Sequence, residues 1–138
     1  PGTPAGWQRI LAVRRQLIEA GAHVLAPCPH QAPCPLAAPD WCHFSRRVAR
    51  SRLHRLAKDA DVPWEDEKFI YVAASRDLPA SHQARVLAPP KSGSGKVLLK
   101  LCQENGTARE RLFTKRDGAN FKLARRLDWG DRLDNTAI

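Results

Sequence analysis

Proline dominates one short stretch of the chain and limits what that stretch can fold into. Five of the thirteen residues from 27 to 39 are proline. The proline ring fixes φ at about −65° and removes the backbone N–H, so this stretch can form neither a helix nor the interior of a sheet. It is therefore predicted to be a stiff loop, with the regular elements on either side of it.

Three of the four cysteines lie in or beside this loop. Cys28 and Cys34 are within it, Cys42 follows it, and Cys102 lies far along the chain, giving the pattern C-x5-C-x7-C-x59-C. Three thiols on one loop can wrap a metal centre, and a fourth from a distant strand can close it. Four cysteines in 138 residues are too few for a disulfide-built scaffold, so reduced or metal-bound thiols are expected.

The residue types leave the identity of the metal open. Thiolates are soft ligands that suit both iron–sulfur clusters and zinc. Closed zinc sites usually contain ligand pairs separated by two to four residues, whereas the wider gaps here favour the larger volume of a cluster. His30 and His43 could also ligate, but the cysteines alone complete a four-thiolate set. The alternative is four unrelated buried thiols, and the polar, proline-rich surroundings of the first three disfavour it.

Local patterns predict a helix and a strand before the loop. A Thr-Pro start and apolar residues at helical spacing predict a helix over 4–20, which Gly21 ends. A strand over 22–26 follows, so the opening is typical of the helix-to-strand half of a βαβ unit. Its first strand is expected upstream of Pro1, and the absence of any Met also indicates that the natural start lies upstream.

After the loop, the patterns predict a mixture of helices and strands. An Asn-Gly pair in the second half of the chain is a strong hairpin signal. The predicted elements are an amphipathic helix over 44–60 with a basic outer face, a buried strand over 69–74, a linker or long loop over 77–95, hairpin strands over 97–102 and 109–115, and a final helix over 117–127.

Positive charge is concentrated in two blocks. The formal net charge is +9, yet residues 44–58 contain six bases and no acid, and residues 96–126 contain nine bases and three acids. An even solubilising coat is the alternative, but clustered bases favour a surface that meets RNA phosphates. No apolar run approaches the roughly 18 residues of a membrane helix, so no membrane partner or secretory leader is expected. The bases predicted to contact RNA are Arg46, Arg47, Arg50, Lys58, Lys115, Arg116, Arg125 and Arg126.

Several short motifs around the cysteines occur together in one known family. They are Ala26-Pro27-Cys28-Pro29-His30, Cys34-Pro35, Trp41-Cys42-His43-Phe44, Glu65-Asp66-Glu67-Lys68-Phe69, Leu101-Cys102 and Trp129-Gly130-Asp131. Over nearly its whole length, the chain resembles the methyltransferase-like assembly factors of the bacterial and mitochondrial small ribosomal subunit. The resemblance implies a [4Fe–4S] cluster on Cys28, Cys34, Cys42 and Cys102. It also implies docking on small-subunit rRNA beside ribosomal proteins, in the cytoplasm of a bacterium or the mitochondrial matrix of a eukaryote.

The resemblance also implies an α/β fold, the C-terminal half of a Rossmann-like methyltransferase fold with a Cys-rich metal-binding loop, a β-hairpin and a terminal helix. The expected domains are residues 1–76, with a Cys-rich insertion over 27–60, a linker over 77–95, and residues 96–138, which close the metal site. The half of the family fold that binds S-adenosylmethionine is missing from this chain, so the word methyltransferase applies to the parent protein more than to this chain.

Three function classes remain on the sequence alone. The leading one is a cluster-bearing, rRNA-binding part of a ribosome assembly factor. The second is an active S-adenosylmethionine-dependent rRNA methyltransferase, to which this half would contribute substrate contacts. The third is a zinc-dependent nucleic-acid-binding module. A hydrolase is poorly supported, because the Ser, His and Asp residues form no nucleophile motif.

Overall fold

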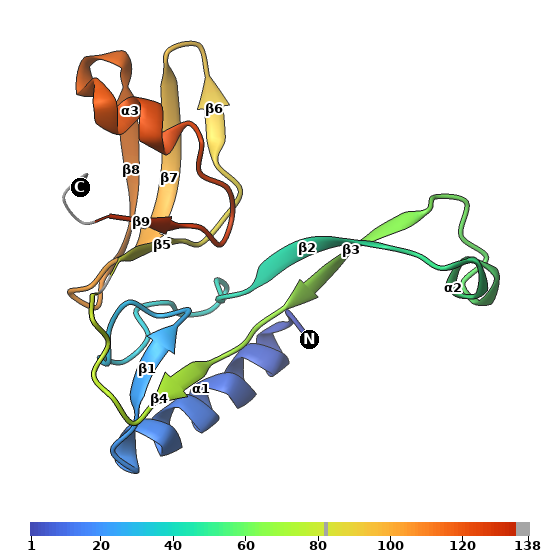
Figure 1. The fold of residues 1–138 in the computed structure, drawn as a ribbon, viewed down its shortest axis with the longest axis horizontal. Coiled ribbons are helices and arrows are strands. Elements are labelled where there is room, and N and C mark those ends of the chain that lie inside the picture. The colour runs from blue at the N-terminus through green and yellow to red at the C-terminus, as the bar shows by residue number, and fades with distance from the viewer. Residues whose placement is uncertain (82, 135–138) are drawn as a thin grey trace.

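The computed structural model describes residues 1–81 and 83–134 and shows a mixed α/β fold built from two lobes and an arm (Figure 1). The N-terminal lobe contains α1 (Pro4–Glu19), β1 (His23–Ala26) and β4 (Ala73–Ser75). The arm contains β2 (Phe44–Ala49), α2 (Arg52–Ala57) and β3 (Trp64–Phe69). The C-terminal lobe contains β5 (Ala84–Val86), β6 (Lys91–Gly93), β7 (Lys96–Cys102), β8 (Ala108–Thr114), a 3-10 turn (Lys115–Asp117), α3 (Ala119–Ala124) and β9 (Arg132–Leu133).

The N-terminal lobe confirms the predicted helix and strand. The Oγ1 of Thr3 accepts a hydrogen bond from the Gly6 backbone N–H at 3.1 Å, which caps the first turn of α1. Gly21 has a φ of 84°, a left-handed conformation that ends the helix and admits β1 directly after it. β1 pairs antiparallel with β4, so the two strands of this lobe do not form the parallel ladder of a βαβ unit.

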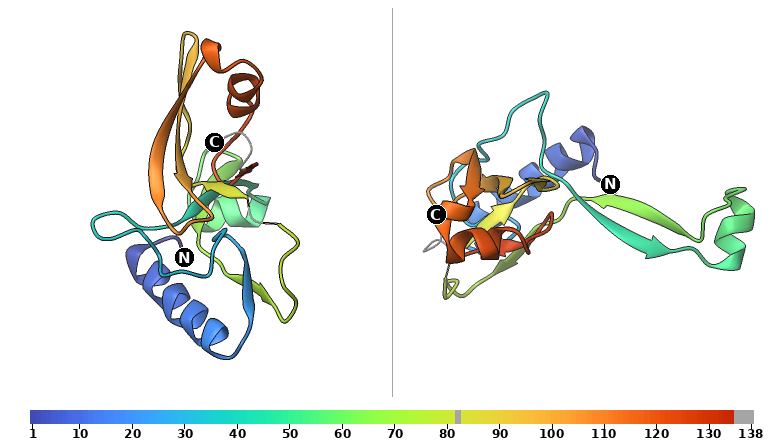
Figure 2. Two further views of the ribbon diagram at one scale, coloured as in Figure 1. Left: turned by 90° about the vertical axis from the view of Figure 1, so that its left-hand side faces the viewer. Right: turned by 90° about the horizontal axis from the view of Figure 1, so that it is seen from above.

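The arm replaces the predicted helix over 44–60, which is wrong except for the short α2. β2 pairs antiparallel with β3 over six residues, in a register that places Arg47 opposite Asp66. The basic strand and the acidic strand thus attract each other across the ladder, and this long-range pairing overrides the local helical spacing. The predicted continuous strand over 69–74 is also wrong, because β3 ends at Phe69 and β4 begins at Ala73. The arm projects away from both lobes (Figure 2).

The C-terminal lobe is organised around β7, which pairs with β5, β6 and β8. The predicted hairpin is confirmed as β7 and β8, and one of its faces is buried. Val97, Leu99, Leu101 and Phe113 are 0% exposed, and Phe121 of α3 packs on them. Apolar burial of this kind supplies most of the free energy that holds a small lobe together.

Two further expectations for this lobe need correction. The predicted linker or long loop over 77–95 contains β5 and β6, and Ala84 and Val86 of β5 are 0% exposed within the core. The prolines of this segment lie outside β5 and β6, and strands of three residues are too short to show a periodicity. The predicted helix over 117–127 is shorter, because residues 115–117 form a 3-10 turn and α3 ends at Ala124. In the part of the chain that the structure describes, no helix has the length and apolarity needed to cross a membrane.

The two lobes meet at the proline-rich loop. Arg85 of β5 donates from Nε to the Pro27 carbonyl at 3.0 Å, and the Nζ of Lys100 on β7 forms an ion pair with Asp40. Both contacts join the loop after β1 to strands of the C-terminal lobe. The loop therefore lies where residues from both halves of the chain can form one site.

Candidate metal centre and nucleic-acid interface

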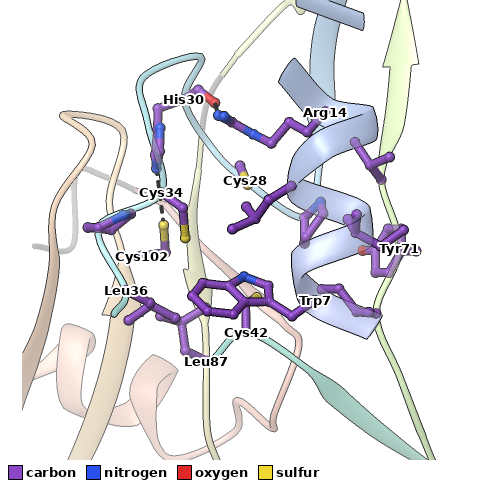
Figure 3. Close-up of a pocket in the computed structure, with 16 residues that line it drawn as sticks. Trp7, Arg14, Cys28, His30, Cys34, Leu36, Cys42, Tyr71, Leu87 and Cys102 are labelled. Carbon is purple, nitrogen blue, oxygen red and sulfur yellow. Dashed lines mark hydrogen bonds between the residues drawn. The ribbon is translucent and has the colours of Figure 1, made fainter. Parts of the chain in front are cut away.

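All four cysteines line one cavity between α1, the proline-rich loop and the end of β7 (Figure 3). Cys28 lies just after β1, Cys34 lies in the loop, Cys42 lies just before β2, and Cys102 is the last residue of β7. None of them is in a disulfide within the described chain. Cys42 and Cys102 are buried, whereas Cys28 and Cys34 are half-buried. The fold thus brings together the cysteines that the sequence separates by up to 74 positions.

Apolar side chains form most of the cavity wall. Trp7 and Leu11 of α1 line one side, and Tyr71 and Leu87 contribute from the segments beside β4 and β5. The cavity has a volume of about 20 Å³ that the centres of water molecules can occupy. This is room for one or two water molecules. A larger group would therefore need the cysteine side chains that line the cavity to move.

Burial governs the chemistry of these thiols. Burial raises the pKa of Cys102 to about 12, and repulsion from the charged forms of Cys28 and Cys34 adds to the rise. Burial, followed by repulsion from the other three cysteines, raises the pKa of Cys42 further. The Cys42 and Cys102 thiols are thus protonated at neutral pH, and a metal that binds them must displace their protons.

The donor set matches a thiolate-bound metal centre. Four soft sulfur ligands from two lobes line a mostly apolar wall, which is the ligand chemistry of zinc and iron–sulfur sites. Among the residues described, no three His, Cys, Asp or Glu side chains are arranged to hold a metal ion directly. The donors therefore fit such a group by type and location, and the required adjustment is movement of the cysteine side chains around it.

The two histidines beside the cysteines have different surroundings. His30 is 4% exposed and lines the cavity, with its Nε2 3.4 Å from the Cys102 Sγ and its Nδ1 3.1 Å from the Ala32 carbonyl. His43 stacks on Trp41 with ring centroids 4.7 Å apart and meets the Trp129 ring edge-on. His30 is thus placed to orient Cys102, whereas His43 is a packing residue of the adjoining aromatic cluster.

The first basic block is largely paired within the arm. Arg47 donates two hydrogen bonds to the Asp66 carboxylate, at 2.9 and 3.0 Å, and its guanidinium lies 3.6 Å above the Trp64 ring. Arg50 and Lys58 each lie 3.0 Å from the Glu65 carboxylate. Arg46 is exposed and lies opposite Glu67 in the ladder. The bases predicted to form the outer face of a helix thus lie beside acids that come later in the chain.

Glu65 is the acidic centre of this network, and its titration gives a testable prediction. Hydrogen bonds from Lys58 and then Arg50 lower the pKa of Glu65 from the usual 4.5 to about 2. Because the pKa in the folded state is lowered, these pairs stabilise the arm above about pH 4.5, and this stabilisation is lost as the pH falls towards 2. We expect a carboxyl NMR titration of Glu65 with a midpoint near 2. Replacing Arg50 and Lys58 by Ala should return the midpoint towards 4.5, and an unchanged midpoint would contradict the assignment.

The second basic block lies on one end of the C-terminal lobe. Lys115 and Arg116 are in the 3-10 turn after β8, and Arg125 and Arg126 directly follow α3; all four are exposed. With Lys122, the latter two line a shallow depression. Within residues 1–81 and 83–134, none of the five has a carboxylate within 4.0 Å. This surface therefore retains the positive charge that an anionic partner would meet.

These features define the chain as a mixed α/β protein in which one cysteine-lined cavity joins two lobes, with a basic surface on one of them. The family described as "Mitochondrial small ribosomal subunit Rsm22" matches residues 1–134, and the chain belongs to this family. It is 31% identical to "Ribosome assembly protein METTL17, mitochondrial" of Homo sapiens over 114 residues, which cover 80% of this chain and 24% of the human protein. It is 21% identical to "Rsm22-cox11 tandem protein 2, mitochondrial" of Schizosaccharomyces pombe, covering 94% of this chain and 23% of that protein. The chain thus spans about a quarter of the length of these relatives.

Two residues of the cavity region were not predicted as site residues. Arg14 of α1 lines the cavity and is 6% exposed, and Arg85 of β5 is 9% exposed beside it. A signal for Arg14 was present, because it shares a helix face with Trp7, Leu11 and Ile18. A base on an otherwise apolar face marks a position that is buried with a specific partner. No comparable signal marks Arg85, which lies on a strand too short for pattern analysis.

Proposed function

We propose that this chain is the part of a small-ribosomal-subunit assembly factor that binds rRNA and carries a structural four-cysteine metal centre, a [4Fe–4S] cluster. The observation that carries the proposal is the meeting of Cys28, Cys34, Cys42 and Cys102 at one cavity between the lobes. Membership of the Rsm22 family and the mitochondrial ribosome-assembly relative support the assembly role and, for a eukaryotic chain, a place of action in the mitochondrial matrix.

The spacing of the thiols favours a cluster over a single zinc ion. Gaps of five and seven residues between the first three cysteines exceed those of usual zinc knuckles. A cubane spreads its four ligands over a larger volume than one ion does, which suits a wide, proline-stiffened loop. When bound, such a centre supplies metal–thiolate links between the loop and β7, and these links stabilise the contact between the lobes.

Contact with rRNA is assigned mainly to the second basic block. Exposed bases without acidic partners can neutralise phosphates and release counterions, whereas bases already paired with carboxylates must first break those pairs. Within the described residues, Lys115, Arg116, Arg125 and Arg126 are of the first kind, and Arg47, Arg50 and Lys58 are of the second. The proposed partners are small-subunit rRNA and the ribosomal proteins next to it.

Two charge variants of the whole chain test this assignment. Replacing Lys115, Arg116, Arg125 and Arg126 together by Ala should weaken binding to small-subunit rRNA about tenfold or more at moderate salt. It should also reduce the log–log salt slope by roughly 0.7–0.9 for each phosphate that the variant no longer neutralises. The matched control replaces Arg47, Arg50 and Lys58 by Ala and should change the slope less. Equal rRNA affinity and slope in wild type and the quadruple variant would contradict the assignment, as would a larger effect of the arm variant.

A further inference from the structure

Arg14 is a buried cation on the wall of the cysteine-lined cavity. Its Nη2 donates to the carbonyls of His30 and Ala32, each at 2.8 Å, which ties the proline-rich loop to α1. Among the described residues, its Nε–H is buried and has no hydrogen-bond partner, and no carboxylate lies within 4.0 Å of the guanidinium. A buried charge in this state is costly unless something opposite in charge comes to it.

Arg85, from the C-terminal lobe, is a second buried arginine that donates to backbone carbonyls. Its Nε donates to the Pro27 carbonyl at 3.0 Å and its Nη1 to the Gly130 carbonyl at 2.9 Å. It too lacks a carboxylate partner within the described chain. Pro27 precedes Cys28 and lines the cavity, as does His30, whose carbonyl accepts from Arg14. Two buried cations from different lobes thus hold the loop that carries the first cysteines.

Trp7 supplies a second unsatisfied donor in the cavity wall. The ring is 4% exposed and lines the cavity beside Cys42 (Figure 3). Its Nε1–H is buried and has no acceptor among the described residues. Buried polar groups in folded proteins almost always have a partner, so two such orphans on one cavity wall indicate an acceptor that the polypeptide does not provide.

The charges of a four-thiolate centre match these donors. Four thiolates around a dipositive zinc ion, or around a dipositive [4Fe–4S] core, carry two net negative charges. The two buried guanidinium groups carry two positive charges, so the filled site would be neutral. Among the described residues, no carboxylate compensates these two cations. Zinc and the oxidised cluster satisfy this balance equally well, so it does not choose between them.

We propose that Arg14 and Arg85 are the charge-compensating residues of the four-cysteine centre, and that Trp7 Nε1 and Arg14 Nε donate hydrogen bonds to its sulfur atoms. This inference rests on the proposed function, because it requires that a metal centre bind the cysteines. Residues in the layer around a metal site typically change metal affinity about 10- to 100-fold when they are replaced. Arg14 and Arg85 are therefore expected to govern how firmly the centre is held.

Variants of Arg14 separate its charge from its hydrogen bonds. Arg14→Gln keeps an NH2 group that can donate to the loop carbonyls but removes the charge, whereas Arg14→Lys keeps the charge. Arg15→Gln is the matched control, because Arg15 is the next residue of α1 and its side chain is 73% exposed. The readout is the rate at which the anaerobically purified whole chain releases its metal to a chelator, followed by absorbance for iron and by a zinc dye for zinc. Circular dichroism confirms that each variant is folded.

We expect Arg14→Gln to release metal about 10- to 100-fold faster than wild type. Arg14→Lys should stay close to the wild-type rate, and Arg15→Gln should equal it. Arg85→Gln gives an independent second test and should resemble Arg14→Gln, so the proposal remains testable if one variant fails to fold. Release at the wild-type rate from both Gln variants would overturn the proposal, as would equally fast release from Arg14→Gln and Arg14→Lys. A wild-type chain that binds neither iron nor zinc would instead overturn the proposed function itself.

Discussion

Replacing Cys102 by Ser is expected to abolish metal binding and to lower the melting temperature to that of the metal-free wild type. Cys102 is the only one of the four cysteines that comes from the C-terminal lobe, so its loss disconnects the centre from β7. A ligand present at 100 times its dissociation constant stabilises a fold by about 2.7 kcal/mol. For a chain of this size, that corresponds to a fall of roughly 5–10 °C in melting temperature.

The control for this variant is Ala108→Ser, which places a hydroxyl on the residue paired with Cys102 across the β7–β8 ladder. It should keep its metal and its melting temperature. The metal-free forms of wild type and Cys102→Ser should melt together, because the difference between them is metal binding. Full metal occupancy and an unchanged melting temperature in Cys102→Ser would contradict the four-cysteine assignment.

Replacing Phe113 by Ala is expected to destabilise the C-terminal lobe by about 3–5 kcal/mol, because the ring is 0% exposed and its removal leaves a cavity in the core. Leu112→Ala is the matched control on the same strand. Leu112 is 53% exposed, so its truncation should cost no more than about 0.5 kcal/mol. Urea unfolding of both variants measures the difference. Because the same lobe positions Cys102, Phe113→Ala should also release metal faster, and equal stability of the two variants would contradict the described core.

Local signals predicted the elements whose stabilising contacts are local. The helix α1 has its cap, its proline and its terminal glycine within its own sequence, and the hairpin of β7 and β8 has its turn between the strands. The arm has no such local signal, because β2 pairs with a strand that comes later in the chain. The first acid of that strand, Glu65, lies fifteen residues after Arg50, its partner in a hydrogen bond. The complementary charges of the basic and acidic segments were visible in the sequence, but their antiparallel register is a property of the fold.

The candidate site likewise contains residues that could be predicted from local sequence signals and residues that could not. Cysteine type and spacing predicted the four cysteines that lie together in the cavity wall, because ligand chemistry can be inferred from composition. The surrounding layer could not be predicted equally well, since Arg85 and Pro27 meet only through the contact between the lobes. The bases predicted to contact RNA show the same limit. Whether a base is paired depends on acids elsewhere in the chain. Arg47 is paired with Asp66 and Arg125 is exposed, although both belong to basic segments of the sequence.

The identity of the metal is the central claim, and one measurement tests it most directly. The chain is purified anaerobically, and its visible absorption spectrum is recorded together with its iron, sulfide and zinc content. A [4Fe–4S] cluster on the four cysteines predicts a brown protein with a broad visible shoulder and about four iron and four sulfide ions per chain. A colourless protein with about one zinc ion per chain would contradict the cluster, and a protein with neither metal would contradict the metal centre altogether.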